Sequence, residues 1–310
     1  MNLNKPAFWD LRKISLWSIL LLPLTALYYL ILETRRKMQK AEKFNIKIIC
    51  VGNIYIGGTG KTPLTIKIAS LLKNKFKLAV IKKKYADQKD EVSLLEKKCR
   101  VISNRSRKIA IEQAIEENYN MVILDDGFQD EEIKKDISIV CFNSAQSIGN
   151  GFILPSGPLR ENLQRLKFAD MVFINGDVNI ELENKIKVHN KRCEIFYSYY
   201  HLLNLENYKN KRYFAFSGIG NNINFLNLLK KKKINIVDYK FFPDHYKYSD
   251  KEIYKLKNFA LKNNLHLITT EKDYLRLSEH HKENINYTEI ELIIKNEDEL
   301  IRKIMSYESN

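Results

Sequence analysis

The sequence predicts an α/β protein with a mostly parallel sheet covered by helices on both faces. Three observations predict this class. Apolar runs at about 46–51, 77–81, 120–124, 137–142 and 171–175 alternate with helical stretches. A glycine-rich loop joins the first run to the helical pattern after it, and the alternation begins again after residue 206. Parallel strands need crossover connections, so this order favours a parallel sheet.

Composition sets limits on the remaining possibilities. The 310 residues allow one large or two ordinary domains, and the four cysteines form no C-x-x-C pair, so neither a zinc knuckle nor a redox motif is indicated. The net charge of +15 is spread along the chain. It is interpreted either as solvated background or, beside the N-terminal apolar run, as attraction to a membrane surface. No nucleic-acid partner is predicted.

Residues 1–40 are expected to form a membrane-docking helix. From Ile14 to Leu32 no residue is charged, and a helix of that length nearly matches a hydrocarbon core of about 30 Å. Pro23 interrupts the run, so the helix is expected to span the bilayer or to lie in its interface. A buried core helix is the alternative. A cleaved signal is not expected, because no small-residue cleavage site follows.

The segment from 41 to 205 is expected to bind a nucleotide. After the strand at 46–51 come Gly57, Gly58, Thr59, Gly60, Lys61 and Thr62, followed by a helical pattern. Glycines let backbone amides converge on phosphate oxygens, a lysine reaches the β and γ phosphates, and a threonine hydroxyl can ligate Mg²⁺. The fold is therefore of the P-loop NTPase type. The usual pattern has a further glycine where this chain has Tyr55.

The strand at 120–124 ends in Asp125 and Asp126. Carboxylates at the tip of an apolar strand are suitable Mg²⁺ ligands beside a phosphate loop. An acidic turn without a metal is the alternative.

The remaining residues, 206–310, are expected to form a smaller α/β domain. Its strands are predicted near 212–217, 234–239 and 266–269, and its helices near 223–232 and 250–263.

Six motifs in order resemble the tetraacyldisaccharide 4′-kinase family of lipid A biosynthesis. They are GGTGKTP at 57–63, DDGFQ at 125–129, LPSGPLRE at 154–161, FSGIGN at 216–221, FPDHY at 242–246 and TEKD at 270–273. The resemblance covers nearly the whole chain, including the apolar N-terminal segment.

The resemblance implies transfer of the ATP γ-phosphate, with Mg²⁺, to the 4′-hydroxyl of a tetraacyl disaccharide 1-phosphate. The reaction would take place at the cytoplasmic face of the inner membrane. It also implies that Asp90 is the catalytic base, with His245 beside it and Lys61 on the phosphates. Substrate contacts are expected from Tyr85, Glu91, Arg160 and Glu161. From the residues alone, His245 is equally well a surface histidine. A helix-capping pair is the alternative for Arg160 and Glu161.

Two departures from the family pattern stand out. Lys83, Lys84 and Tyr85 replace an Arg-Gly-Tyr and lead to Asp90 without the usual longer segment, and Asp130 replaces the histidine that commonly follows DDGFQ. A membrane-associated P-loop ATPase or GTPase switch is the competing hypothesis. In TEKD the lysine stands one place too late for a guanine-recognition element. A membrane adaptor with a vestigial nucleotide site is a third interpretation, disfavoured because Lys61 and both aspartates remain.

Overall fold

The computed structural model describes residues 5–11, 13–85 and 89–307. The chain divides into two compact units, both discontinuous in sequence. The larger holds Lys5–Lys84, Lys98–Tyr199 and Leu292–Asn310, and the smaller holds Tyr85–Lys97 and Tyr200–Glu291. The expected border near 40 has no counterpart in this division. Two segments also belong to a different unit from the residues that flank or precede them: 85–97 belongs to the smaller unit, and 292–310 to the larger.

The larger unit is built on an eight-stranded sheet in the order β12-β7-β6-β5-β1-β4-β2-β3. Its strands are β1 (Lys47–Gly52), β2 (Leu78–Lys83), β3 (Val101–Asn104), β4 (Met121–Asp125), β5 (Ile137–Asn143), β6 (Met171–Asn175), β7 (Glu194–Leu202) and β12 (Ile290–Ile294). Strands β1 to β7 pair in parallel throughout. The border between the units falls within β7 and β12. The predicted mostly parallel sheet is confirmed.

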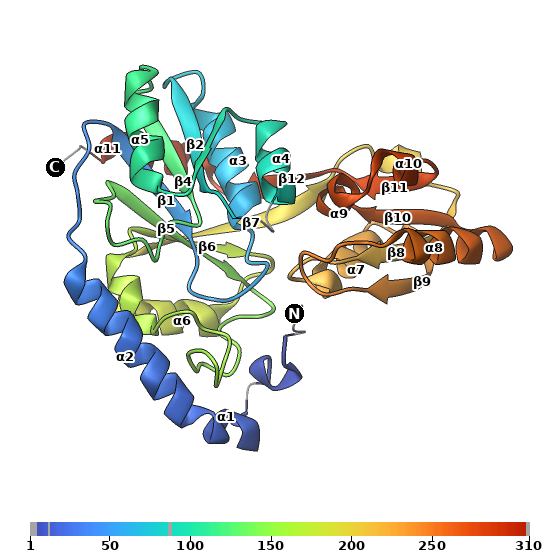
Figure 1. Cartoon of the computed structure of the whole chain (residues 1–310), viewed down its shortest axis with the longest axis horizontal. Helices are drawn as coiled ribbons and strands as arrows, with labels where there is room; N and C mark the ends of the chain where they lie inside the picture. Colours follow the sequence, from blue (N-terminus) through green and yellow to red (C-terminus); the bar gives the residue numbers. More distant parts are fainter. Residues whose placement is uncertain (1–4, 12, 86–88, 308–310) are drawn as a thin grey trace. The chain divides into compact units, whose positions relative to one another are not determined.

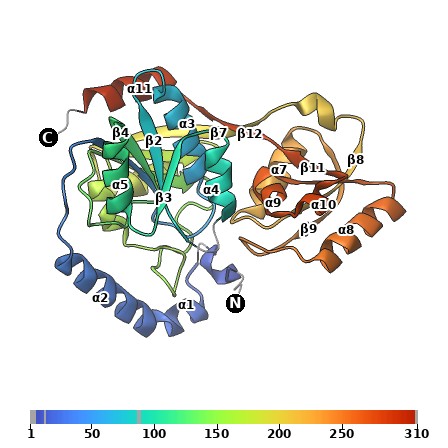
Figure 2. The same cartoon turned by 45° about the horizontal axis from the view of Figure 1, so that its top comes forward.

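Helices flank this sheet (Figure 1). They are α1 (Leu16–Leu20), α2 (Leu22–Met38), α3 (Lys61–Leu72), α5 (Arg107–Glu116), α6 (Ile180–His189) and α11 (Glu297–Ser306), with 3₁₀ turns η1 (Ala7–Trp9) and η2 (Leu163–Phe168). Figure 2 shows α11 beside α3, where Lys67 Nζ lies 2.8 Å from Glu297 Oε1. Strand β1 is buried from Ile48 onwards, so the segment that leads to the phosphate loop is a rigid part of the core.

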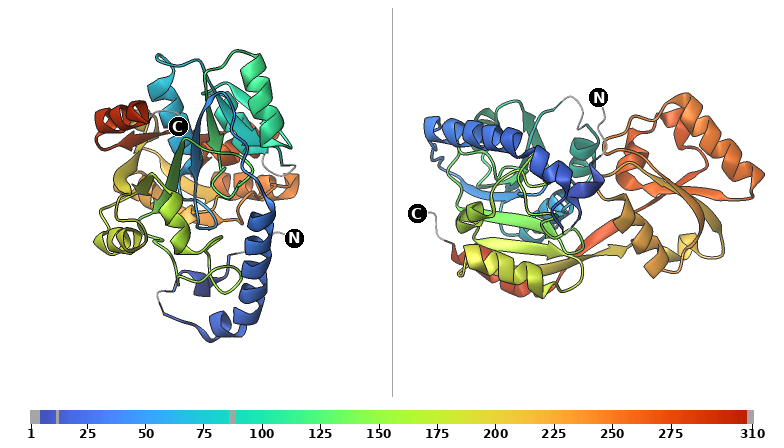
Figure 3. Two further views of the ribbon diagram at one scale, coloured as in Figure 1. Left: turned by 90° about the vertical axis from the view of Figure 1, so that its left-hand side faces the viewer. Right: turned by 90° about the horizontal axis from the view of Figure 1, so that it is seen from below.

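The N-terminal apolar run forms two helices rather than one. Helix α1 ends before Leu21, and Pro23 stands in the first turn of α2, where a missing N–H costs no intrahelical bond. Figure 3 shows both helices, in blue, along one side of the larger unit. Within the described part of the chain, no helix combines the length and apolar character needed to cross a membrane.

The smaller unit has a four-stranded parallel sheet in the order β11-β10-β8-β9. Its elements are α4 (Lys89–Glu96), η3 (Leu205–Tyr208), β8 (Arg212–Ser217), α7 (Asn222–Lys231), β9 (Asn235–Phe241), α8 (Asp250–Lys262), β10 (His266–Thr270), α9 (Glu271–Arg276), α10 (Glu279–Lys282) and β11 (Ile285–Thr288). Alternate residues of β8 enter different cores: Phe214 and Phe216 pack with α8, and Tyr213 and Ala215 with α7. The sheet is therefore covered on both faces, as alternation along a strand requires.

Candidate active site

The phosphate loop lies at the carboxyl end of β1, between the strand and α3. Gly60 has a φ of 96° and precedes Lys61, the first residue of α3, so the loop uses a conformation that favours glycine. Gly52 is also required, because a Cβ there would lie 2.4 Å from the Cβ of Phe128. Buried Asn53 shapes the loop from inside, donating to Thr59 Oγ1 at 2.9 Å and to the Tyr55 carbonyl at 2.6 Å. These contacts leave the amino end of α3 ready to face an anion.

Tyr55, the departure from the usual loop pattern, has a structural role. Its side chain is fully buried, and its hydroxyl donates to Asp10 Oδ1 at 2.6 Å. Its backbone forms an antiparallel bridge with Leu159, flanked by a bond from Ile56 N to the Pro158 carbonyl at 2.8 Å. The LPSGPLRE segment is thereby attached directly to the phosphate loop. This attachment explains why two motifs far apart in sequence belong to one site.

Asp125 is fully buried at the end of β4 and is surrounded by donors. It lies opposite Val51 of β1 and Lys82 of β2 in the parallel register. Lys82 Nζ donates to Asp125 Oδ2 at 2.7 Å, and Thr65 Oγ1 to Oδ1 at 3.1 Å. Thr62, the predicted metal ligand, reaches the same carboxylate at 3.3 Å. Sequence reasoning missed Lys82. The only indication in the sequence is that a charged residue follows directly on the apolar run of this strand.

Asp126 turns away from Asp125 because its backbone is left-handed, with a φ of 60°. Its carboxylate accepts from Arg160 at 2.9 and 3.2 Å and lies 3.7 Å from Lys61 Nζ. Burial raises the pKa of this carboxyl, but the charges of Lys61, Arg160 and Lys82 outweigh burial and hold the pKa well below its ordinary value. Asp126 is therefore a carboxylate at neutral pH.

A second ion pair, between Arg107 and Asp130, supports the turn at Asp126. Arg107 donates to the Asp126 carbonyl at 2.7 Å and to the Asp130 carboxylate at 2.9 Å. Asp130 thus occupies the place of the missing histidine with a specific function in this chain: it holds the arginine that grips the backbone of Asp126.

The oxygen atoms at this site suit a hard cation. Thr62, Asp125 and Asp126 supply a hydroxyl and two carboxylates, the ligands that Mg²⁺ prefers. The same carboxylates also pair with protein cations, Asp125 with Lys82, and Asp126 with Arg160 and Lys61. The residues fit Mg²⁺, with Asp125 Oδ2 shared between Thr62 and Lys82.

Arg160 and Glu161, both expected to contact substrate, are placed differently. Arg160 is partly exposed and faces Asp126, whereas Glu161 is 2% exposed. Glu161 forms two ion pairs: its Oε1 lies 2.8 Å from Arg36 Nη2 of α2, and its Oε2 lies 3.4 Å from Arg165 Nε. The geometry thus gives Glu161 an anchoring contact with α2.

In the smaller unit, Asp90 lies on α4, and its side chain is 4% exposed. Arg276 grips one carboxylate oxygen with two bonds, Nε at 3.0 Å and Nη2 at 2.7 Å. His245 Nδ1 lies 3.4 Å from the other oxygen. Burial raises the pKa of Asp90, but His245, Lys272 and Arg276 together hold it far below its ordinary value. The structure therefore brings the predicted Asp90 and His245 together.

Glu91 and Lys272 complete this cluster. Lys272 Nζ lies 2.8 Å from Glu91 Oε1 and 3.6 Å from Asp90 Oδ2. Burial lowers the pKa of Lys272, but Glu91, Asp244 and Asp90 outweigh burial and raise it. Glu91 also faces His245 Nε2 at 3.7 Å.

Buried Asp273 positions the arginine. Its carboxylate accepts from Arg276 at 2.9 Å, from Tyr248 at 2.9 Å and from the Gly218 amide at 3.0 Å. These groups follow the carboxyl ends of β8, β9 and β10, where the three C-terminal motifs meet. Arg276, three residues beyond the last motif, carried no signal in the sequence.

Tyr85, the remaining predicted substrate contact, is 48% exposed. The segment that follows it, 86–88, lies outside the described residues.

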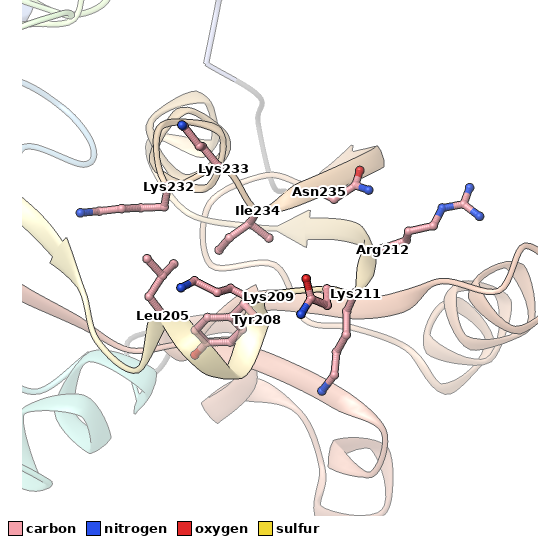
Figure 4. Close-up of a pocket in the computed structure, with 10 residues that line it drawn as sticks. Leu205, Tyr208, Lys209, Lys211, Arg212, Lys232, Lys233, Ile234 and Asn235 are labelled. Atoms are coloured by element: carbon pink, nitrogen blue, oxygen red, sulfur yellow. The ribbon is translucent and has the colours of Figure 1, made fainter.

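A cavity of about 370 Å³ lies at the amino-terminal edge of the small sheet, where β8 and β9 begin, opposite the edge that carries the Asp90 cluster. It is lined by Leu205, Tyr208 and Ile234 with cations at its rim, and Lys211 and Arg212 point away from Lys232 and Lys233 (Figure 4). Its cations therefore do not converge on one ligand.

Comparison with known proteins identifies a family. The tetraacyldisaccharide-1-P 4′-kinase profile matches residues 17–308. A tetraacyldisaccharide 4′-kinase of Pelagibacter ubique is 46% identical over 98% of both chains, and one of Rickettsia canadensis is 35% identical over 98% of this chain and 97% of its own. The crystal structure of LpxK from Aquifex aeolicus in complex with ATP superposes with a TM-score of 0.72 at 26% identity. That match covers 93% of this chain and 98% of the other.

Proposed function

The chain belongs to the tetraacyldisaccharide-1-P 4′-kinase family, and on that premise we propose that it transfers the γ-phosphate of ATP to the 4′-hydroxyl of an acylated disaccharide 1-phosphate. One observation carries the assignment. Lys61, Thr62, Asp125 and Asp126 meet at the carboxyl edge of the parallel sheet, where P-loop enzymes handle phosphates. The family match favours this kinase over a membrane-associated ATPase or GTPase switch.

The larger unit supplies the nucleotide half of the reaction. The amides at the start of α3 and the Lys61 ammonium hold the β and γ phosphates, and Arg160 adds a planar donor beside Asp126. Thr62, Asp125 and Asp126 are the residues that would hold Mg²⁺. When bound, Mg²⁺ neutralises charge on the phosphate oxygens. The ATP complex of the Aquifex aeolicus relative supports the choice of nucleotide.

Asp90 supplies the acceptor half. With a strongly lowered pKa it is too weak a base to ionise a sugar hydroxyl in advance. Its role is to orient the hydroxyl and to accept the proton late, when the transferring phosphoryl group is already loosely bound. His245 faces the free oxygen of Asp90 and tunes or relays that proton. Lys272 and Arg276 keep the carboxylate charged.

Helices α1 and α2 suit an interfacial position on the cytoplasmic face of the inner membrane. Two of their polar residues contact the protein: Thr25 bonds Ser156 at 2.8 Å, and Tyr28 bonds the Arg160 carbonyl at 3.3 Å, whereas Arg35 and Lys37 near the end of α2 are exposed. Their apolar residues face outwards, among them Leu16, Trp17, Leu20, Leu24, Leu27, Leu30 and Ile31, each at least half exposed. Such an inverted pattern matches a lipid surface, where an acylated substrate resides.

The direct test is transfer of ³²P from γ-labelled ATP to a detergent-dispersed tetraacyl disaccharide 1-phosphate. Lys61→Ala and Asp90→Asn are each expected to lower kcat at least a hundredfold, because each removes an interaction with the reacting groups. Lys75→Ala and Asp238→Asn, exposed substitutions in the same two units, are matched controls and retain activity. Hydrolysis of ATP without any labelled lipid would instead identify a nucleotide switch.

A further inference from the structure

Three side chains of types that can ligate a metal lie close together in the smaller unit, and none of them belongs to the Asp90 cluster. Asp250 Oδ1 lies 3.4 Å from His281 Nε2 and 3.9 Å from His280 Nε2. The three ligand atoms all lie within 4.8 Å of one another. In a tetrahedral zinc site ligand atoms are about 3.3 Å apart, because Zn–N and Zn–O bonds measure about 2.0–2.1 Å. The Asp250–His281 separation already has about that value, and the Asp250–His280 separation is longer.

The backbone on both sides of this cluster is fixed. Asp250 is the first residue of α8, and Ser249 and Glu252 form a capping box that sets where the helix begins. Ile253, one turn on, and Leu277, just before α10, are buried in the same core. The site therefore spans two anchored elements, α8 and α10.

Ser278 contacts both imidazoles: its Oγ lies 3.4 Å from His280 Nε2, and its closer contact orients His281. Its Oγ lies 2.8 Å from His281 Nδ1. A proton on Nδ1 donated to this hydroxyl leaves Nε2, the nitrogen that faces Asp250, with the free lone pair. Metal-bound histidines commonly use the second ring nitrogen in this way. His281 is also the most enclosed of the three, with 12% of its side chain exposed, whereas Asp250 and His280 are open to solvent.

We propose that Asp250, His280 and His281 bind a divalent transition-metal ion, Zn²⁺, independently of the Mg²⁺ used with ATP. Two imidazole nitrogens and one carboxylate oxygen are a donor set that favours Zn²⁺ over Mg²⁺, which prefers oxygen ligands. Water completes the coordination. Binding ties the start of α8 to α10.

The test uses the full chain, stripped of metal with a chelator and held in excess Mg²⁺ so that the nucleotide site does not compete. Zn²⁺ affinity is measured by competition with a chromophoric chelator, and Co²⁺ serves as a spectroscopic probe. One equivalent of Co²⁺ is expected to give visible absorption bands that Zn²⁺ removes. His281→Ala and Asp250→Asn are each expected to weaken Zn²⁺ binding at least tenfold, and Ser278→Ala by about tenfold through the loss of orientation.

His201→Ala is the matched control, because His201 is an exposed histidine of the same unit and is expected to leave the affinity unchanged. Circular dichroism and ATP binding of each variant show that it is folded. Equal Zn²⁺ affinity in the unaltered chain and in His281→Ala, or no competition with the chelator at all, overturns the site.

Discussion

Arg276 holds one oxygen of Asp90 with two hydrogen bonds, although the two residues lie 186 positions apart in the sequence. An arginine that no motif contains therefore joins His245 and Lys272 in lowering the pKa of the proposed base. The sequence was sufficient to predict Asp90 and His245 as neighbours through family resemblance. It was not sufficient to predict how far the pKa of Asp90 is lowered, because that depends on which cations the fold brings to the same edge of the sheet.

Replacing Arg276 with Gln is expected to shift the acidic limb of the pH profile of kcat/KM to higher pH. The pKa of Asp90 is depressed in the folded protein, so its carboxylate persists below the ordinary value of about 3.9 and is protonated only as the pH falls through the depressed value. Loss of the guanidinium raises the pKa towards that ordinary value. Kinase assays across acidic pH measure the limb.

Arg276→Lys is the control, because it retains the charge and loses the bidentate geometry. Its acidic limb is expected between those of the unaltered enzyme and Arg276→Gln. If Arg276→Gln changed kcat/KM equally at every pH, the arginine would have only a structural role.

Neighbouring strands determine the environment of Asp125. Because β2 and β4 pair in parallel with Lys82 opposite Asp125, the two charges are brought together at the buried sheet edge. The apolar runs predicted β1, β2, β4, β5 and β6 within two residues, since buried parallel strands are continuously apolar. Strand β3 was missed because it has only four residues, and β7 because its polar residues obscure the pattern.

Lys82→Met is expected to lower the free energy of unfolding by about 3–5 kcal/mol, because it leaves a buried carboxylate without its partner. Urea denaturation measures the change. The double variant Lys82→Met/Asp125→Leu is expected to recover most of the loss, since two apolar side chains replace a buried pair at little cost. A double variant as unstable as the single one would mean that Lys82 acts through packing rather than charge.

For the whole molecule, the decisive surface is the outward face of α1 and α2. The run of uncharged residues from Ile14 to Leu32 predicted an apolar N-terminal segment. It did not predict that the segment divides into two helices at Leu21, or which of its residues face the protein. That depends on hydrogen bonds from Thr25 and Tyr28 to a loop more than a hundred residues away, which periodicity cannot reveal.

Substituting Leu24, Leu27 and Ile31 together with Asp is expected to weaken binding to anionic phospholipid vesicles at least about a hundredfold. Each exposed side chain contributes about 1.5–3 kcal/mol when it enters an apolar phase. Vesicle co-flotation measures the bound fraction. The matched control replaces Ile223, Tyr254 and Leu261, which are more exposed than these three but lie in the smaller unit. If both triple variants bound vesicles alike, α2 would not be the lipid-binding element.

The discontinuous division of the chain has a consequence for its genetics. The segment Tyr85–Lys97, which carries Asp90, is encoded inside the larger unit, while its partners His245 and Arg276 are encoded more than a hundred codons later. No single cut in the gene separates two self-sufficient halves. A fragment that begins at Tyr200 lacks the proposed base, and recombination can exchange the smaller unit between relatives only by replacing two stretches of DNA at once.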